Sequence, residues 1–184
     1  SGLVTSEAGA TATFTVVLNT QPTGDVTIGL SSSDLTEGTV APASLTFTAA
    51  NWNTPQTVTV TGQNDDIDDG DIAYTIVTAA AVSTDSKYNN LAVADVSVTN
   101  TDNDTAGNTV SPISGLVTTE AGGTATFTIK LTSEPTGDVT IGLSSSDLTE
   151  GAVSPTSLTF TTANWNTPQT LTVTGQNDDV ADGD

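Results

Sequence analysis

The chain alternates polar and apolar residues in short runs, and threonine is the commonest polar partner. Seven such runs are predicted to be strands, over residues 3–5, 12–19, 26–31, 44–48, 56–61, 72–79 and 94–101. Successive side chains of a strand point to opposite faces, so the apolar members of each run should line one face. In the fifth run, Val58 and Val60 are predicted to point inward while Thr57 and Thr59 point outward. No segment shows the periodicity of a helix.

An internal repeat organises the chain. Residues 1–71 align without a gap with residues 114–184, so that Trp52 corresponds to Trp165. Val17 becomes Lys130 in the second copy, which indicates that this position faces water. Seven short strands separated by turn residues favour an immunoglobulin-like β-sandwich. The predicted fold is therefore all-β, as tandem immunoglobulin-like sandwiches: a complete one over residues 1–104, a linker over 105–113, and an incomplete one over 114–184 without its last two strands.

Composition narrows the possible partners. The chain has 22 acidic residues, two lysines and a net charge of −20. This charge argues against binding to nucleic acid or to anionic membrane surfaces, and it favours cations. Cysteine and histidine are absent, so neither a disulfide framework nor the usual ligands of zinc or copper are present. No apolar run is long enough to insert into a membrane, and any export signal is expected to lie outside this segment.

An acidic run follows the fifth predicted strand. Its carboxylates are Asp65, Asp66, Asp68, Asp69 and Asp71. Like charges this close repel, and Ca²⁺, which takes six to eight oxygen ligands from irregular loops, is the usual reason to hold them together. A solvated acidic turn is the alternative. The run does not fit an EF-hand loop, because Asp69 stands where that loop requires glycine.

Strand direction predicts that most acids of the first repeat meet at one end of the sandwich. Successive antiparallel strands reverse direction, so alternate loops share a pole. The acidic pole is predicted to contain Glu7, Asp34, Glu37, Asp65, Asp66, Asp68, Asp69, Asp71, Asp102 and Asp104. Asp25, Asp85 and Lys87 fall at the opposite pole. Such crowding would destabilise the fold unless cations neutralise it.

The order of these acids resembles the Calx-beta family, β-sandwich modules of sodium–calcium exchangers and of large bacterial surface proteins. The resemblance covers the first repeat and the 71 residues of the second. It implies that Ca²⁺ binds to Glu7, Asp34, Asp65, Asp66, Asp102 and Asp104. Asp69 and Asp71, which stand where the family often has glutamate, join the predicted ligands, as do the second-repeat residues Glu120, Asp147, Asp178 and Asp179. Asp102 and Asp104 are also similar to cadherin-type calcium junctions.

The sequence thus predicts a calcium-binding, non-enzymatic module of a large secreted or cell-surface protein, such as an adhesin or a matrix filament. Calcium would stiffen each repeat and its junction, and the partners would be calcium, neighbouring repeats and other copies in a filament. One alternative is a self-assembling filament in which a neighbouring chain completes the second repeat. A carbohydrate-binding module is another, with Trp52 as a stacking platform, although Trp52 is more simply interpreted as a plug on the core. Catalysis is not predicted, because histidine, cysteine and arginine are absent.

Overall fold

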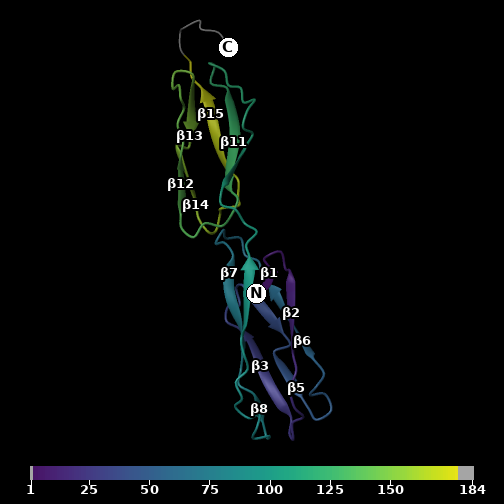
Figure 1. Cartoon of the computed structure of the whole chain (residues 1–184). Coiled ribbons are helices and arrows are strands. Elements are labelled where there is room, and N and C mark those ends of the chain that lie inside the picture. Colours follow the sequence, from purple (N-terminus) through teal and green to yellow (C-terminus); the bar gives the residue numbers. More distant parts are fainter. Residues whose placement is uncertain (1, 178–184) are drawn as a thin grey trace. The chain divides into compact units, whose positions relative to one another are not determined.

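The computed structural model describes residues 2–177, and these residues form strands and loops without a helix that is long and apolar enough to cross a membrane. The chain divides into two compact units. The first comprises the residues up to Asp65 together with Asp69–Asn103 (Figure 1). The second comprises Asp66–Asp68 and the residues from Asp104 onward. The all-β class predicted from the sequence is confirmed.

The first unit is a sandwich of two sheets. Its strands are β1 (Leu3–Ser6), β2 (Thr11–Val16), β3 (Val26–Ser32), β4 (Gly38–Ala41), β5 (Ser44–Phe47), β6 (Gln56–Gly62), β7 (Ile72–Thr78), β8 (Val82–Ser83) and β9 (Val96–Thr101). One sheet has the order β1-β9-β7-β3-β5, with β8 also on β3, and the other has the order β2-β6-β4. The β1–β9 pair is parallel, with Leu3 opposite Val98, while the other pairs are antiparallel.

The sequence did not predict β4 and β8. β4 pairs with β6 in one sheet and β5 pairs with β3 in the other, with only Pro42 and Ala43 between them. Proline has no amide hydrogen to continue a ladder, which suits a strand that changes sheets here. Since β4 and β5 act as one interrupted strand, the extra element does not change which loops share a pole of the sandwich. β8 similarly continues the pairing of β7 along β3 after a break.

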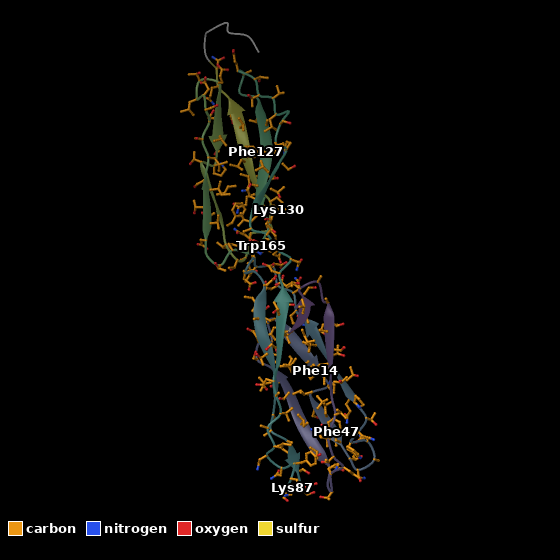
Figure 2. All side chains as sticks on the ribbon, in the orientation of Figure 1. Phe14, Phe47, Lys87, Phe127, Lys130 and Trp165 are labelled. Atoms are coloured by element: carbon orange, nitrogen blue, oxygen red, sulfur yellow. The ribbon has the colours of Figure 1, made fainter. Side chains whose placement is uncertain are left out.

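The predicted alternation accounts for the core of the first unit. Val26, Phe47, Val58, Val60 and Ile76 are all fully buried, and Figure 2 shows Phe47 among the side chains of this unit. Each such side chain contributes about 1.5–3 kcal/mol through its removal from water. The half-buried and exposed residues of β2 alternate one by one, as a strand covered on one face requires.

The second unit has two smaller sheets. Its strands are β10 (Asn108–Ser111), β11 (Thr124–Leu131), β12 (Val139–Gly142), β13 (Gly151–Ser154), β14 (Ser157–Phe160) and β15 (Gln169–Gly175). The orders are β10-β11-β15-β13 and β12-β14. β10 lies inside residues 105–113, where the sequence predicts a linker. A strand with Val110 as its one apolar residue shows no alternation to be recognised, and its pairing with β11 is what establishes it.

The two tryptophans occupy equivalent turns. Trp165 is half-buried and packs against the core of the second unit, and Trp52 is half-buried in the first. The carbonyl oxygen of Trp52 accepts a hydrogen bond from the amide of Leu18 at 3.0 Å, and Trp165 does the same for Leu131 at 2.9 Å. The packing of Trp165 on its core agrees with a plug at this turn, and the same role for Trp52 stays a prediction.

Candidate metal centre

Loops far apart in the sequence meet at the acidic pole. Glu7 directly follows β1, Glu37 directly precedes β4, and Gln63 and Asn103 lie just beyond β6 and β9. The amide of Gln63 donates to the carbonyl oxygen of Glu37 at 3.0 Å. The amide of Asn103 donates to Oε2 of Glu7 at 3.1 Å. The strand ends thus hold both glutamates in defined positions.

A buried network of hydrogen bonds lies inside the sandwich, next to the loops of this pole. Asn100 of β9 is 1% exposed, and its Oδ1 accepts the hydroxyl of Thr5 at 2.9 Å. Its Nδ2 donates to the carbonyl oxygen of Gln63 at 3.0 Å and to Oε2 of Glu37 at 3.4 Å. Buried polar groups are costly unless they are hydrogen-bonded, so this network fixes its members in one arrangement. Asn100 thereby positions the Glu37 carboxylate.

Two glycines allow the strands to approach this closely. A Cβ atom on Gly38 would overlap the ring and hydroxyl of Tyr74. A Cβ atom on Gly62 would overlap the carbonyl of Ser6 and the side chain of Asn100. Both glycines are therefore required by packing around the network.

The first cluster of carboxylates consists of Glu37, Asp65 and Asp69. One oxygen from each lies within 4.8 Å of the others. Glu37 is 6% exposed, whereas Asp65 is half-buried and Asp69 is exposed. Burial raises the pKa of Glu37, the hydrogen bond from Asn100 opposes this, and the charge of Asp69 raises the pKa further. The ionised form of Glu37 is thus disfavoured in the absence of a cation.

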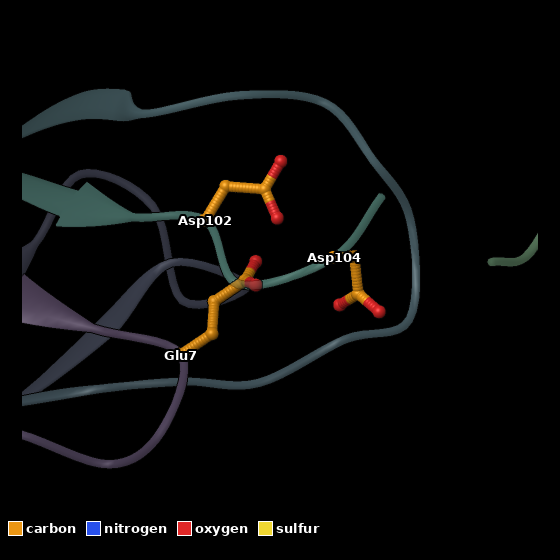
Figure 3. A group of neighbouring side chains, drawn as sticks. All are labelled: Glu7, Asp102 and Asp104. Atoms are coloured by element: carbon orange, nitrogen blue, oxygen red, sulfur yellow. The ribbon is translucent and has the colours of Figure 1, made fainter. Parts of the chain in front are cut away.

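The second cluster consists of Glu7, Asp102 and Asp104, again with one oxygen from each within 4.8 Å of the others (Figure 3). Glu7 is 4% exposed, and its Oε2 accepts both the amide of Asn103 and, at 3.0 Å, the Nδ2 of Asn103. Burial raises the pKa of Glu7 most strongly, and the charge of Asp102 adds to the rise, while the bonds from Asn103 lower it.

The donor set of both clusters fits a hard cation. Each offers only carboxylate oxygens on irregular loops, which is the chemistry that calcium uses. Nitrogen and sulfur ligands for a softer metal are absent, because the chain has no histidine or cysteine. The residues that would hold calcium are therefore Glu37, Asp65 and Asp69 in one cluster, and Glu7, Asp102 and Asp104 in the other.

Three further predicted ligands of the first repeat lie outside both clusters. The carboxylate of Asp34 accepts the hydroxyl of Thr36 at 2.6 Å and its amide at 3.0 Å, and these bonds lower the pKa of Asp34. Oδ1 of Asp71 accepts the amide of Asp102 at 3.2 Å. The carbonyl oxygen of Asp66 accepts the amide of Glu134 at 2.6 Å within the second unit.

The predicted ligands of the second repeat have a different environment. Glu120 and Asp147 are exposed, and among the residues that the structure describes neither belongs to a cluster of three acids. The carboxylate of Asp147 accepts the hydroxyl and the amide of Thr149, which lowers the pKa of Asp147. Asp178 and Asp179 lie outside the described residues.

Glu37 is the residue that the predicted ligand set lacked. The sequence placed it at the acidic pole but not among the ligands, although its counterpart Glu150 is retained in the second repeat. The strand that follows this glutamate differs between the two repeats, whereas the glutamate is the same in both. That identity was the available signal in the sequence. The buried Glu37 accepts a hydrogen bond from Asn100, which is 63 positions away in the sequence and could not be paired with it from the pattern alone.

Comparisons with known proteins add little to this geometry. No protein-family model and no curated protein sequence matches the chain. The solved structure of CBD12 from CALX1.2 is 16% identical, with a TM-score of 0.43, over 94% of this chain and 72% of that one. SSP-19, an MSP-domain protein like family member in Caenorhabditis elegans, is 14% identical, with a TM-score of 0.39, over 55% of this chain and 92% of that one. Both TM-scores are too low to assign the chain to a family, and the Calx-beta resemblance stays a prediction from the sequence.

Proposed function

We propose that this chain is a calcium-binding, non-enzymatic β-sandwich module of a tandem array, in which calcium stabilises the acidic pole. The carrying observation is the pair of clusters, each of which joins one buried glutamate to two aspartates. Each cluster joins the glutamate of one loop to two aspartates of another loop far away in the sequence, so the arrangement exists only in the folded chain. An ion bound there would stabilise the folded state alone.

Electrostatic repulsion supports a cation at these positions. Two like charges about 4 Å apart repel by about 1 kcal/mol in water and by about 4 kcal/mol at the effective dielectric of a protein surface. Each cluster contains three such pairs within 4.8 Å. The raised pKa values of Glu7 and Glu37 have the same origin in part, since nearby aspartates contribute to both.

Calcium is the preferred ion because of the ligand type and the setting. Magnesium requires near-ideal octahedral geometry and dehydrates reluctantly, whereas calcium accepts irregular carboxylate cages. Extracellular calcium modules bind with dissociation constants of about 10⁻⁴–10⁻³ M, and a pole of exposed loops suits this range. A secreted or cell-surface location, a stiffened link between repeats and a role in an adhesin or matrix filament belong to the same proposal. The self-assembly and carbohydrate-binding alternatives stay predictions of the sequence.

Thermal unfolding of the full chain tests the calcium part. In millimolar calcium, the melting temperature should rise by at least about 5 °C over metal-free buffer, since a ligand that binds only the folded state stabilises it by mass action. Equal concentrations of magnesium should give a smaller rise. Identical melting curves in calcium and in chelator would contradict the proposal and leave the acids as a solvated surface.

A further inference from the structure

An apolar groove lies beside the end of β2, at the pole opposite the acidic clusters. Its volume is about 450 Å³. The apolar residues that line it include Val16, Leu18, Ile28, Tyr88, Leu91 and Val93. Val17 and Leu91 at this groove are 43% and 50% exposed. Exposed apolar surface at a strand edge is a typical place for another strand to add.

The second unit shows what occupies the equivalent edge. There, β10 pairs antiparallel with the end of β11, with Asn108 opposite Leu131 and Val110 opposite Ile129. Val110 packs against the buried cluster that contains Ile129 and Leu131. By the alignment of the repeats, Ile129 and Leu131 correspond to Val16 and Leu18, which line the groove of the first unit.

The different lengths of β2 and β11 follow from the pairing of β11 with β10. β11 extends to Leu131, whereas β2 ends at Val16 although the two sequences are nearly the same. Among residues 2–177, β6 is the strand that pairs with β2, and the outer edge of β2 carries no ladder. The sequence predicted a strand through residue 19 in the first repeat, and it stops short because no strand pairs with its end.

We propose that the groove beside β2 is an acceptor for one extended strand with the sequence of β10. The strand runs antiparallel to residues 15–18, and its valine equivalent to Val110 fills the groove. Its source is an adjoining repeat of the array, joined to the acceptor repeat in the way that residues 104–113 are joined ahead of Ser114. The proposal depends on the array part of the proposed function and not on calcium.

The chemistry of strand addition favours this occupant. Main-chain hydrogen bonds supply the affinity, and a pocket for alternate side chains supplies the specificity. A covalently joined segment also acts at a millimolar effective concentration, so a short strand of modest affinity is sufficient. The exposed Val17, which is Lys130 in the second repeat, lies between Val16 and Leu18, the two groove residues whose side chains would contact the added strand.

The test adds a copy of residues 104–113 directly ahead of Ser1 in the full chain. Amide hydrogen exchange at residues 15–18 should slow on the order of tenfold relative to the chain without the extension. The same extension with the Val110→Asp change in the copy should not slow it, because a carboxylate would enter an apolar groove. Residues 128–131 are already paired with β10 and serve as an internal reference that should stay constant.

Two results would overturn the proposal. One is equal exchange at residues 15–18 with and without the extension. The other is the same protection by micromolar free peptide of residues 104–113, which would assign the groove to separate chains. The measurement is repeated in chelator, where protection should persist. If the extension slows exchange at residues 15–18 but calcium does not raise the melting temperature, only calcium binding is refuted. If calcium raises the melting temperature but the extension does not slow exchange, only strand addition is refuted.

Discussion

The two units carry almost the same sequence yet differ in strand length and burial. β3 has seven residues in the first unit, whereas its counterpart β12 has four. The extra residues of β3 pair with β7, for which the second unit has no counterpart among its described strands. Conversely, β11 is longer than β2 because β10 pairs with its end. Local sequence therefore sets where a strand can form, and its neighbours set how far it extends.

The same comparison explains why the buried glutamates of the acidic clusters occur in the first unit. Glu7 and Glu37 are buried in the first unit, whereas the corresponding Glu120 and Glu150 are exposed. The strand that makes the difference is β9. Its Asn100 donates a hydrogen bond to Glu37, and the residues that follow it include Asp102 and Asp104, which lie beside Glu7. Burial of the glutamates is thus a property of the completed sandwich and not of the segment that contains them.

The largest expected difference between the units concerns an equivalent core isoleucine. Ile28 is 2% exposed, whereas Ile141 is half-buried. Ile28→Ala should lower the free energy of unfolding of the first unit by about 2–5 kcal/mol, because it leaves a cavity. Ile141→Ala should lower that of the second unit by roughly half as much, since less apolar surface leaves water there. Equal losses of unfolding free energy in the two variants would contradict this difference between the units.

Urea unfolding followed by tryptophan fluorescence measures the two values separately. The chain has two tryptophans, Trp52 in the first unit and Trp165 in the second. A Trp165→Phe background reports on the first unit, and a Trp52→Phe background reports on the second. Both rings are half-buried, so each should change its emission when its own unit unfolds.

The next effect sharpens the comparison at the acidic pole. Glu37→Gln should weaken calcium binding by at least about tenfold, because it removes one charged ligand from a three-carboxylate cluster. The matched control is Glu150→Gln, which changes the corresponding exposed residue of the second repeat and should leave that affinity unchanged. Isothermal titration of both full-length variants with calcium distinguishes them. An equal loss in both would show that net charge, and not the buried cluster, governs binding.

The smallest effect is a pH dependence that calcium should suppress. The pKa values of Glu7 and Glu37 are raised in the folded state, so the folded chain binds protons more readily than the unfolded chain just above the usual glutamate range. In metal-free buffer, the stability of the first unit should therefore be greater in this window and decline as the pH rises through the raised pKa values.

Melting temperatures at a series of pH values in metal-stripped buffer measure this decline. Calcium should remove it by favouring the ionised carboxylates, and Glu37→Gln should reduce it in the absence of calcium. At still lower pH the trend should reverse, since the pKa values of Asp34 and Asp85 are lowered by hydrogen bonds in the folded state. A stability that rises steadily from mildly acidic to neutral pH would contradict the raised values.

Much of the fold could be predicted because it depends on periodicity. Alternation identified the paired strands with the correct inward residues, such as Val58, Val60 and Ile76. β4, β8 and β10 were missed, since each has a single valine and so shows no repeated apolar position, and each is defined by its ladder more than by its own pattern. The poles were predictable because antiparallel strands alternate in direction, and β4 preserved that alternation by running in series with β5.

The sequence by itself determined the repeat, the alternating faces and the presence of acids on loops that share one end of the sandwich. It did so because each of these features follows from spacing along the chain. The tertiary structure alone decided which acids meet: Glu37 joins Asp65 and Asp69, whereas Asp34 turns back to Thr36. The physical reason is the buried Asn100, which reaches Glu37 from β9 across the sandwich and holds a carboxylate where burial and like charges disfavour it without a cation.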